Sequence, residues 1–542
     1  MSLTALGTGV DAYDHALEAT RLSYPDVVVG GKTLNRGTAV VSLTKPVESA
    51  ETAAARAAQI ARLFTTTLST DSPVVELGWP VAGPFAMGPA GVVFDGYLGV
   101  AQKLLDEHHP RFLRMIDDLR AADVLLRREI ATDDFLAART GSAVKTPTDL
   151  ASLWNDAMQE RWRRPEGWRA FFSSSGTEAV EAALKLSYEV AYKRFVATFG
   201  MDVFRRVQAE LGTPTVPYFD RDPSLKDHPV YADYPFQVVA CEGSFHGRTL
   251  GSLHLTRSKK AHHLGYPKAG NVHHVPYNAG NDPIRALVDA RGIAEILAIP
   301  GELRRVMKEQ GKIPKDLFAA FVAEPFQGEG GYVPGDPGFF RAARRVCDET
   351  GALLVVDEVQ SVARTGALFA TEHLGIRPDV VVTAKGMVIG VTLASADLEK
   401  RLHTGWHSNT WGAGRVLDVN FAWTVLDTLL RHKDPTFSGL SYFENEVVKG
   451  RRLAEALDRL QAKHLSLVVS HRGLGLMRGL VVRKRDAIVR RAWLDGLKLL
   501  GCGLGGETSV IRVLFLADTL SREIDEFERV LDKALCDVEA SE

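Results

Sequence analysis

A lysine stands at the end of one of the most apolar runs in the chain. Lys385 follows VVVTA and precedes a glycine. A lysine amine in such a place loses its hydration, and desolvation lowers the pKa of an amine. A neutral amine can attack an aldehyde and form a Schiff base. A lysine that reaches from a strand end into solvent would show the same pattern, so Lys385 alone does not decide between catalysis and structure.

A carboxylate closes a second apolar run. Asp357 ends LLVVD and is followed by EVQ. A buried carboxylate needs a partner, because an isolated buried charge is costly. A protonated ring nitrogen of a bound cofactor would be such a partner. The alternative is an aspartate that caps the next helix.

Two further segments could bind a ligand. Ser175, Gly176 and Thr177 follow an apolar run and open a long helical pattern. Backbone N–H groups at a helix N-terminus, with two hydroxyls, could hold a phosphate, although a capping box would look the same. Phe245 begins FHGRT and could stack on a flat ring, or could simply pack inside a loop.

The elements around these residues predict a layered α/β domain. Short apolar runs alternate with helical patterns between about residues 170 and 385, as in buried parallel sheets. Residues beyond the carboxyl ends of parallel strands meet at one edge of the sheet. The predicted strands end near these residues: Ser175, Glu324, Asp357 and Lys385.

Outside this region the patterns are simpler. Residues 47–68 predict a helix, and 83–99 predict a β-hairpin. After residue 415 the sequence predicts two long helices, a hairpin, a strand at 509–516 and a final helix. These C-terminal elements form a separate α+β unit.

Composition limits the classes of function. A net charge of −2 argues against a dedicated nucleic-acid binder. The four cysteines are far apart and form no C-x-x-C pair, so we expect no metal site and no disulfide framework. The N-terminus has no secretory pattern and no run is long enough to span a membrane. We therefore expect a cytoplasmic protein without membrane or nucleic-acid partners.

A series of segments in order resembles the class-III (ω-amino acid) aminotransferases, which have the fold of type I pyridoxal-phosphate (PLP) enzymes. The segments are GPFAMGPAGVVFDGYLGVAQ, FFSSSGTEAVEAALKL, GSFHGRTLGSL, FVAEPFQGEGG, LLVVDEVQSVARTGALFA, PDVVVTAKG and SNTWGAG. The resemblance covers about residues 83–535. Within the family, SNTWGAGRVLDV and GLGLMRGLVV are most similar to lysine 6-aminotransferases, with ornithine aminotransferases as a related group.

The resemblance implies an α/β fold with a mostly parallel seven-stranded sheet flanked by helices, and a smaller α+β domain made of N- and C-terminal segments. It implies four parts of the chain. These are an N-terminal extension over 1–82, the first part of the small domain over 83–114, the large PLP-binding domain over 115–405 with an insertion near 199–235, and the rest of the small domain over 406–542.

The resemblance also implies roles for single residues. Lys385 would carry pyridoxal 5′-phosphate and shuttle the proton, and Asp357 would pair with the pyridine nitrogen. The other implied cofactor contacts are Ser175, Gly176, Thr177, Phe245, His246, Glu324, Val359, Gln360 and, from a second subunit of a homodimer with shared active sites, Thr410.

Glu329, Arg512 and Arg248 are the implied substrate contacts. In the ornithine, lysine and 4-aminobutyrate members a glutamate covers an arginine when an ω-amine binds, and frees it for a carboxylate. The implied activity is ping-pong transfer of an amino group from an ω-amine or amino acid, with a lysine-like donor favoured, to a 2-oxo acid such as 2-oxoglutarate. The same scaffold could instead serve a racemase, decarboxylase or aminomutase.

The sequence departs from the family pattern at several points. Only Gly386 and Gly390 remain of the usual glycine-rich run after the lysine, and RVLFLADTL lacks the family's double proline. These segments build the mouth of the site, so they bear on the substrate rather than on the cofactor.

Overall fold

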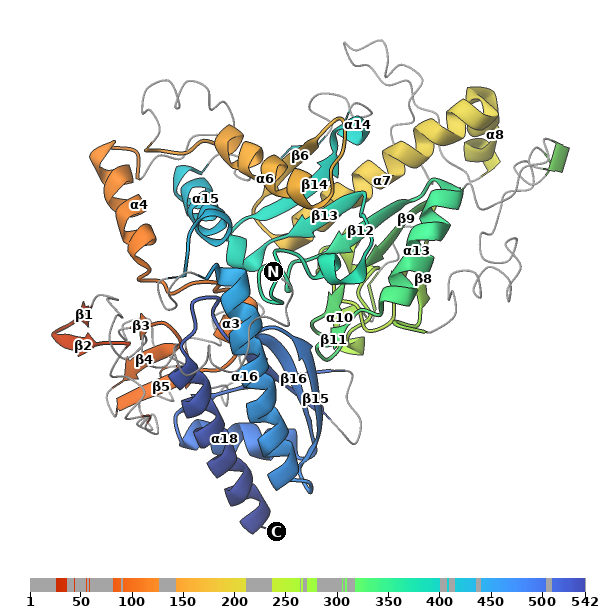
Figure 1. Ribbon diagram of the computed structural model, residues 1–542. Coiled ribbons are helices and arrows are strands. Elements are labelled where there is room, and N and C mark those ends of the chain that lie inside the picture. Colours follow the sequence, from red (N-terminus) through yellow and green to blue (C-terminus); the bar gives the residue numbers. More distant parts are fainter. Residues whose placement is uncertain are drawn as a thin grey trace.

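The computed structural model describes most of the chain. The described residues are 26–36, 43, 55, 58, 81–88, 91–125, 143–210, 236–263, 265–266, 271–279, 305, 308–309, 317–399, 407–408, 415–434, 440–503 and 509–541. Within them the chain forms two lobes, and the long helix α16 (Tyr442–Lys463) runs from their junction along the second lobe (Figure 1).

A seven-stranded sheet forms the centre of the first lobe. Six strands run parallel, and β14 is antiparallel to both of its neighbours. The order across the sheet is β6 (Trp168–Ser173), β14 (Gly390–Ser395), β13 (Val380–Thr383), β12 (Leu353–Asp357), β9 (Phe318–Ala323), β7 (Gln237–Cys241) and β8 (Asn271–Val275). The predicted α/β class and the mostly parallel seven-stranded sheet are confirmed.

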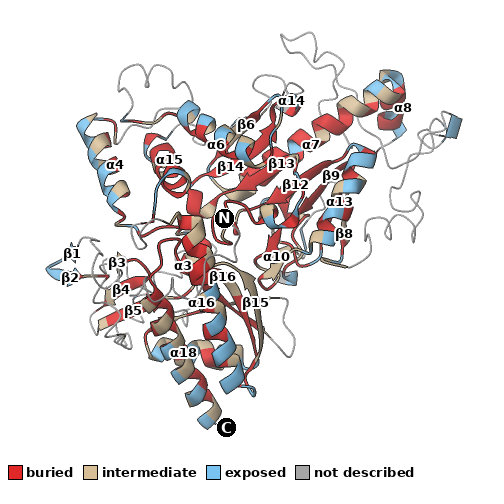
Figure 2. Ribbon diagram, in the orientation of Figure 1, coloured by how far each residue is buried: buried red, intermediate tan, exposed pale blue. Residues whose placement is uncertain are grey.

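Helices cover both faces of this sheet, because its strands are apolar on both sides (Figure 2). Val355 packs with α7 (Gly176–Phe199) and α8 (Met201–Glu210) on one face. Leu354 points to the other face, which α6 (Pro147–Arg161), α13 (Pro337–Thr350) and α15 (Val416–Arg431) cover. Successive residues of β12 thus enter different cores.

The second lobe contains two four-stranded sheets. The first has the order β15 (Val468–Leu474), β16 (Met477–Val482), β19 (Ser509–Leu514) and β18 (Leu500–Cys502). The second has the order β17 (Leu497–Lys498), β5 (Gly91–Asp95), β4 (Phe85–Gly88) and β3 (Val81–Ala82). Together with α16, the helices α17 (Arg485–Leu494) and α18 (Ser521–Ala540) pack against them. The predicted N-terminal hairpin is therefore present as β4 and β5. Its strand β5 also pairs with the C-terminal strand β17.

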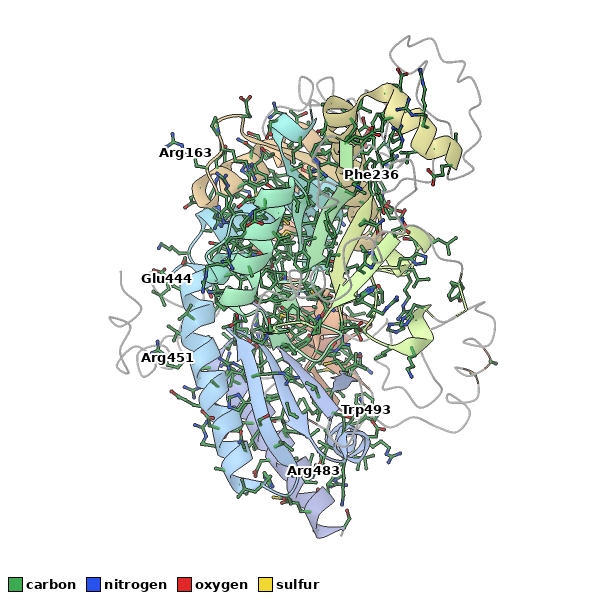
Figure 3. All side chains as sticks on the ribbon, turned by 90° about the vertical axis from the view of Figure 1, so that its right-hand side faces the viewer. Arg163, Phe236, Glu444, Arg451, Arg483 and Trp493 are labelled. Carbon is green, nitrogen blue, oxygen red and sulfur yellow. The ribbon has the colours of Figure 1, made fainter. Side chains whose placement is uncertain are left out.

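Figure 3 shows the same two lobes from the side, with Phe236 in the upper lobe and Trp493 and Arg483 in the lower one. Short elements complete the fold. They are β1 (Val27–Val29), β2 (Lys32–Leu34), α3 (Leu98–Ala101), α4 (Pro110–Ala121), α9 (Leu250–Leu253), α10 (Lys260–His263), β10 (Phe326–Gln327), β11 (Val333–Pro334), η5 (Ala370–Leu374), η6 (Lys385–Met387) and α14 (Ala396–Glu399).

Two predicted segments fall largely outside the described residues. Of the helix expected over 47–68, only Ala55 and Ala58 are described, and both are helical. The insertion near 199–235 begins with α8, and its remainder, 211–235, lies outside the described residues. Among the helices that the structure describes, none combines the length and apolar composition needed to cross a membrane.

A buried arginine ties the N-terminal segment to the second lobe. The Arg36 guanidinium donates to Glu523 Oε1 at 2.7 Å and Oε2 at 3.1 Å, and also reaches Asp518 at 3.2 Å and Asp106 at 3.4 Å. The side chains of all four residues are fully buried. Removing one partner of such a network leaves buried charge uncompensated.

Arg36→Met should therefore lower the free energy of unfolding by about 3–5 kcal/mol, measured as a lower urea midpoint. Lys32→Met is the matched control, because Lys32 lies in the β1–β2 hairpin just before Arg36 and is exposed. We expect the control to change stability by less than about 0.5 kcal/mol. Equal losses in the two variants would contradict the assigned role of Arg36.

Candidate active site

The polar residues that follow four parallel strands meet at one edge of the large sheet. Asp357 is the last residue of β12, Glu324 follows β9, Lys385 follows β13 and Ser175 follows β6. A cavity of about 640 Å³ lies at this edge. It is lined by Gln102, Ser174, Ser175, Gly176, Thr177, Phe245, His246, Gly247, Arg248, Asp357, Val359, Ala384, Lys385 and Val388. Nine of the sequence-predicted site residues are among them.

The Lys385 side chain is half-buried at the cavity, and its amine is weakly basic. Burial lowers its pKa to about 7, the nearby Arg512 and Arg364 act in the same direction, and Glu329 partly opposes them. The backbone of Lys385 has φ +50, a left-handed conformation that is uncommon outside glycine. Such backbone strain is typical of functional sites.

Two glycines allow the segment around Lys385 to pack this closely. A Cβ on Gly386 would lie 2.3 Å from Leu104 Cγ, and one on Gly390 would lie 2.2 Å from the Ser175 carbonyl oxygen. Both distances are far below van der Waals contact. The two glycines that remain after the lysine are thus the ones that this packing requires.

Asp357 is held by two contacts. Its Oδ2 lies 2.8 Å from His246 Nδ1, and its Oδ1 accepts a 3.0 Å hydrogen bond from the Val359 backbone N–H. Burial disfavours the charged form of His246, but the hydrogen bond and charge of Asp357, with Glu324 adding to them, outweigh it and raise the pKa of the imidazole. His246 therefore fixes the orientation of the Asp357 carboxyl group.

The N-terminus of α7 points its first backbone N–H groups toward the cavity. Ser175 is the N-cap residue, and its hydroxyl accepts from the Glu178 N–H at 3.5 Å. Thr177 Oγ1 lies 2.6 Å from Ser252 Oγ and 2.9 Å from Thr249 Oγ1. A helix N-terminus with adjacent hydroxyls is suited to an anion such as phosphate.

Phe245 and Arg248 form part of the rim. The Arg248 guanidinium lies 5.6 Å from the centre of the Phe245 ring, and it is 3.2 Å from His262 Nε2. Arg248 is exposed, whereas Phe245 is partly buried. The ring is thus covered by a cation on the solvent side.

A buried ion pair lies beside the lysine. Arg512 on β19 donates to Glu329 Oε1, and Lys259 Nζ lies 3.4 Å from Glu329 Oε2. Burial opposes ionisation of Glu329, but Arg512 outweighs it and lowers the pKa of the carboxyl. Two nitrogens of Arg512, Nε and Nη1, are buried and have no hydrogen-bond partner among the described residues. The guanidinium therefore has donors left for a further ligand.

Five predicted residues are not among those that line the cavity. Glu329 and Arg512 form the ion pair described above, and the other three are Glu324, Gln360 and Thr410. Glu324 does not line the cavity, because its carboxyl accepts hydrogen bonds from the backbone N–H groups of Phe245 and Gly328, each at 2.9 Å, and burial raises its pKa to about 7. Gln360 is also absent from the lining, and its buried Oε1 has no partner in the described part of the chain. Thr410 lies outside the described residues.

Sequence reasoning missed five lining residues, of which Gln102 is the most distant in the chain. Arg364 fixes the turn that carries it, by donating to the carbonyl oxygens of Ala101 and Lys103, each at 2.8 Å. Gln102 belongs to a segment that resembled the family, but neither its residue type nor its spacing indicated contact with the site. The other four, Ser174, Gly247, Ala384 and Val388, adjoin residues that were predicted.

Several known proteins resemble this chain over half of its length or more. The class-III aminotransferase family model matches residues 134–535. Acetylornithine aminotransferase of Gloeobacter violaceus is 34% identical over 302 residues, covering 55% of this chain and 66% of the relative. Putrescine aminotransferase of Pectobacterium atrosepticum is 30% identical over 325 residues, covering 58% of this chain and 55% of the relative.

Solved structures show the same fold. Lysine aminotransferase from M. tuberculosis superposes with a TM-score of 0.63 at 23% identity, covering 87% of this chain and 97% of that one. Ornithine aminotransferase from Toxoplasma gondii ME49 superposes with a TM-score of 0.64 at 19% identity, covering 92% of this chain and 97% of that one. The family match spans well over half of the chain and includes every strand-end residue of the site, so this protein belongs to the class-III aminotransferases, PLP-dependent enzymes of fold type I that transfer an amino group from a donor to an acceptor.

Proposed function

We propose that this aminotransferase takes its amino group from an ω-amine or ω-amino acid, with a lysine-like donor favoured, and passes it to a 2-oxo acid such as 2-oxoglutarate in a ping-pong reaction. The observation that carries the proposal is the Glu329–Arg512 ion pair beside Lys385. An arginine that a carboxylate covers can serve two kinds of substrate, because the carboxylate neutralises it for one and leaves it free for the other.

The residues present fit PLP. The N-terminus of α7 offers donors for a phosphate, Asp357 offers a carboxylate for a protonated ring nitrogen, and Lys385 offers an amine that is about half neutral near pH 7. The buried Oε1 of Gln360 has no hydrogen-bond partner among the described residues, and a polar substituent of the bound ring would supply one. When bound, PLP acts as an electron sink for the substrate carbon that bears the amino group.

Lys385 has two tasks in this proposal. Its neutral Nζ would hold the cofactor covalently, and once an amino donor has taken its place the same Nζ would carry the proton to and from the substrate carbon. Burial and the neighbouring arginines suit both tasks, because they hold the pKa of the amine near neutrality, where it can accept and release a proton.

Asp357 and His246 act together on the ring nitrogen. The Asp357 carboxylate keeps a proton on that nitrogen, and His246 prevents the carboxylate from turning away. Val359 and Phe245 both line the cavity and are proposed to bound the two faces of the ring. Ser175, Gly176 and Thr177 orient the phosphate end.

Glu329 acts as the gate over Arg512. With an ω-amine donor, Glu329 keeps the guanidinium neutralised. With a 2-oxo acid, Glu329 must leave, and Lys259 at 3.4 Å gives it a second cationic partner. The unpartnered Nε and Nη1 of Arg512 then join in binding the substrate carboxylate. Arg248 on the rim is proposed as a further carboxylate contact.

We also propose a cytoplasmic homodimer with shared active sites, in which a second copy supplies Thr410 to the phosphate. The proposed domain division is a large domain over 115–405 and a small domain that joins 83–114 to 406–542. The pairing of β5 with β17 supports the small domain. The helix α15, within 406–542, packs on the large sheet instead. Residues 1–82 add the Arg36 network to the small domain.

Lys385→Ala should abolish covalent attachment of PLP and lower turnover by about 10⁴-fold, because the general acid–base group is lost. In the wild type, amine donor alone should bleach the visible absorbance of the bound cofactor, and a 2-oxo acid should restore it. Lys260→Ala, at an exposed lysine of α10, is the control. Borohydride labelling of Lys385→Ala at another lysine would refute the assignment.

Arg512→Leu should separate the two half-reactions. We expect kcat/KM for 2-oxoglutarate to fall about 10- to 100-fold, since a charged hydrogen bond contributes about 1.5–3 kcal/mol. The half-reaction with a diamine, which brings no carboxylate, should change much less. Single-turnover rates of each half-reaction measure the difference, and equal losses in both would count against the gate.

The rate at which PLP reconstitutes the apoenzyme should rise with pH and level off above about pH 7. The neutral amine of Lys385 is the nucleophile, and its pKa is about 7, so protonation removes it as the pH falls. Arg512→Leu should shift this profile to higher pH, because a cation that lowers the pKa is removed. An unshifted profile would show that Arg512 does not act on Lys385.

A further inference from the structure

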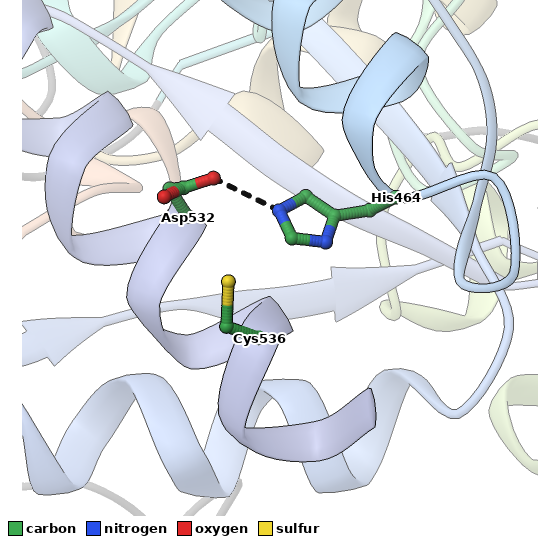
Figure 4. Close-up of side chains that lie close together, drawn as sticks. All are labelled: His464, Asp532 and Cys536. Carbon is green, nitrogen blue, oxygen red and sulfur yellow. Dashed lines mark hydrogen bonds and ion pairs between the residues drawn. The ribbon is translucent and has the colours of Figure 1, made fainter. Parts of the chain in front are cut away.

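Three metal-ligating side chains meet at the far end of the second lobe, away from the active site. His464 is the C-cap residue of α16, and Asp532 and Cys536 lie one turn apart on α18 (Figure 4). One ligand atom from each of the three residues lies within 4.8 Å of the other two. Residues four apart on a helix share a face, which is why Asp532 and Cys536 both point toward His464.

The histidine is buried and faces two carboxylates. Its Nε2 lies 2.9 Å from Asp532 Oδ1, and its Nδ1 lies 2.8 Å from Glu539 Oε2. A protonated imidazole can donate to both carboxylates, whereas a neutral imidazole has only one N–H and can donate to one of them alone. A cation shared by Nε2 and Asp532 would satisfy both ring nitrogens, because Nδ1–H would then donate to Glu539.

The Glu539 contact has the geometry that metal-bound histidines use. Such histidines donate the second ring N–H to a carboxylate, which fixes the ring and raises the basicity of the ligating nitrogen. Glu539 is itself held by the Ser466 hydroxyl, which donates to Oε1. The ring of His464 is thus oriented before any metal arrives.

The ligand set selects the metal. A thiolate, an imidazole and a carboxylate together suit Zn²⁺, with bonds of about 2.0–2.3 Å and four-coordinate geometry. Ligand atoms in such a site are about 3–4 Å apart, so small side-chain movements close the present spacing. Cys536 is exposed, which leaves the fourth position open to water.

The local charge also suits a dication, and one lysine competes with the metal for Asp532. Asp532, Glu539 and a Cys536 thiolate together carry three negative charges. Lys463 supplies one positive charge and donates to both oxygens of Asp532, each at 2.7 Å. Lys463 must therefore release at least one oxygen for the metal.

We propose that His464, Asp532 and Cys536 bind one Zn²⁺ ion that joins the C-terminal ends of α16 and α18, with water as the fourth ligand and Glu539 as the support of His464. On binding, the Cys536 thiol loses its proton to solvent and the thiolate becomes a metal ligand. The expectation from sequence was no metal site, because the four cysteines are far apart. His464 lies 68 residues before Asp532 in the sequence, and only the packing of α16 on α18 brings them together.

The cysteines provide the test. Cys241, Cys347 and Cys502 are buried and Cys536 is exposed, so a thiol reagent such as Ellman's reagent should modify Cys536 first in the folded holoenzyme. One equivalent of Zn²⁺ should slow this modification at least about tenfold. Glu539→Gln should weaken the apparent Zn²⁺ affinity by about 10- to 100-fold.

Asp532→Asn keeps the thiol but removes a ligand, so Zn²⁺ should no longer protect Cys536. Asp537→Asn is the matched control on the same helix, because Asp537 pairs with Arg491 instead, and protection should persist in it. Lys463→Met, which removes the competing ammonium, should strengthen protection several-fold. The proposal is overturned if Zn²⁺ gives no protection to the wild type, if protection survives in Asp532→Asn, or if Lys463→Met weakens it.

Discussion

The burial of one amine beside two arginines is the constraint on which the rest of the site depends. Lys385 lies in the same charge environment as Arg512 and Arg364, and burial and these cations together bring its pKa to about 7. Arg364 belongs to the loop after β12, whereas Arg512 comes from β19 of the second lobe. The reactivity of the lysine therefore depends on how the two lobes are joined.

Several contacts hold that junction. Arg364 bonds two carbonyl oxygens of the turn at 101–103, the same turn from which Gln102 enters the cavity. The Ala517 N–H donates to the Leu104 carbonyl at 2.8 Å, shortly after β19. Arg36 then joins Asp106 to Asp518. The N-terminal segment, the turn and the strand that carries Arg512 thus form one connected support.

Local patterns predicted much of this fold because its strands are short, apolar and followed by polar residues. Asp357, Lys385 and Ser175 were found in this way. The sequence did not indicate β14, since VIGVTLAS directly follows the catalytic turn and has no polar boundary of its own. Nor did it indicate the contacts of Arg36 or His464. The side-chain partners of Arg36 are 70 or more residues away in the sequence, and those of His464 are at least 68 residues away. Contacts of that range depend on tertiary packing, which residue spacing does not show.

After Lys385 the chain has fewer glycines than the family pattern, and the packing shows how this departure can leave the chemistry intact. A glycine-rich segment is needed only where a backbone or side chain approaches within the radius of a Cβ. In this chain those points are Gly386, against Leu104, and Gly390, against Ser175. Val388 lies between them with φ +68 and its side chain partly exposed, and it lines the cavity instead of packing beneath it. A branched side chain at that position occupies space at the cavity that a glycine would leave open, while the lysine keeps its place.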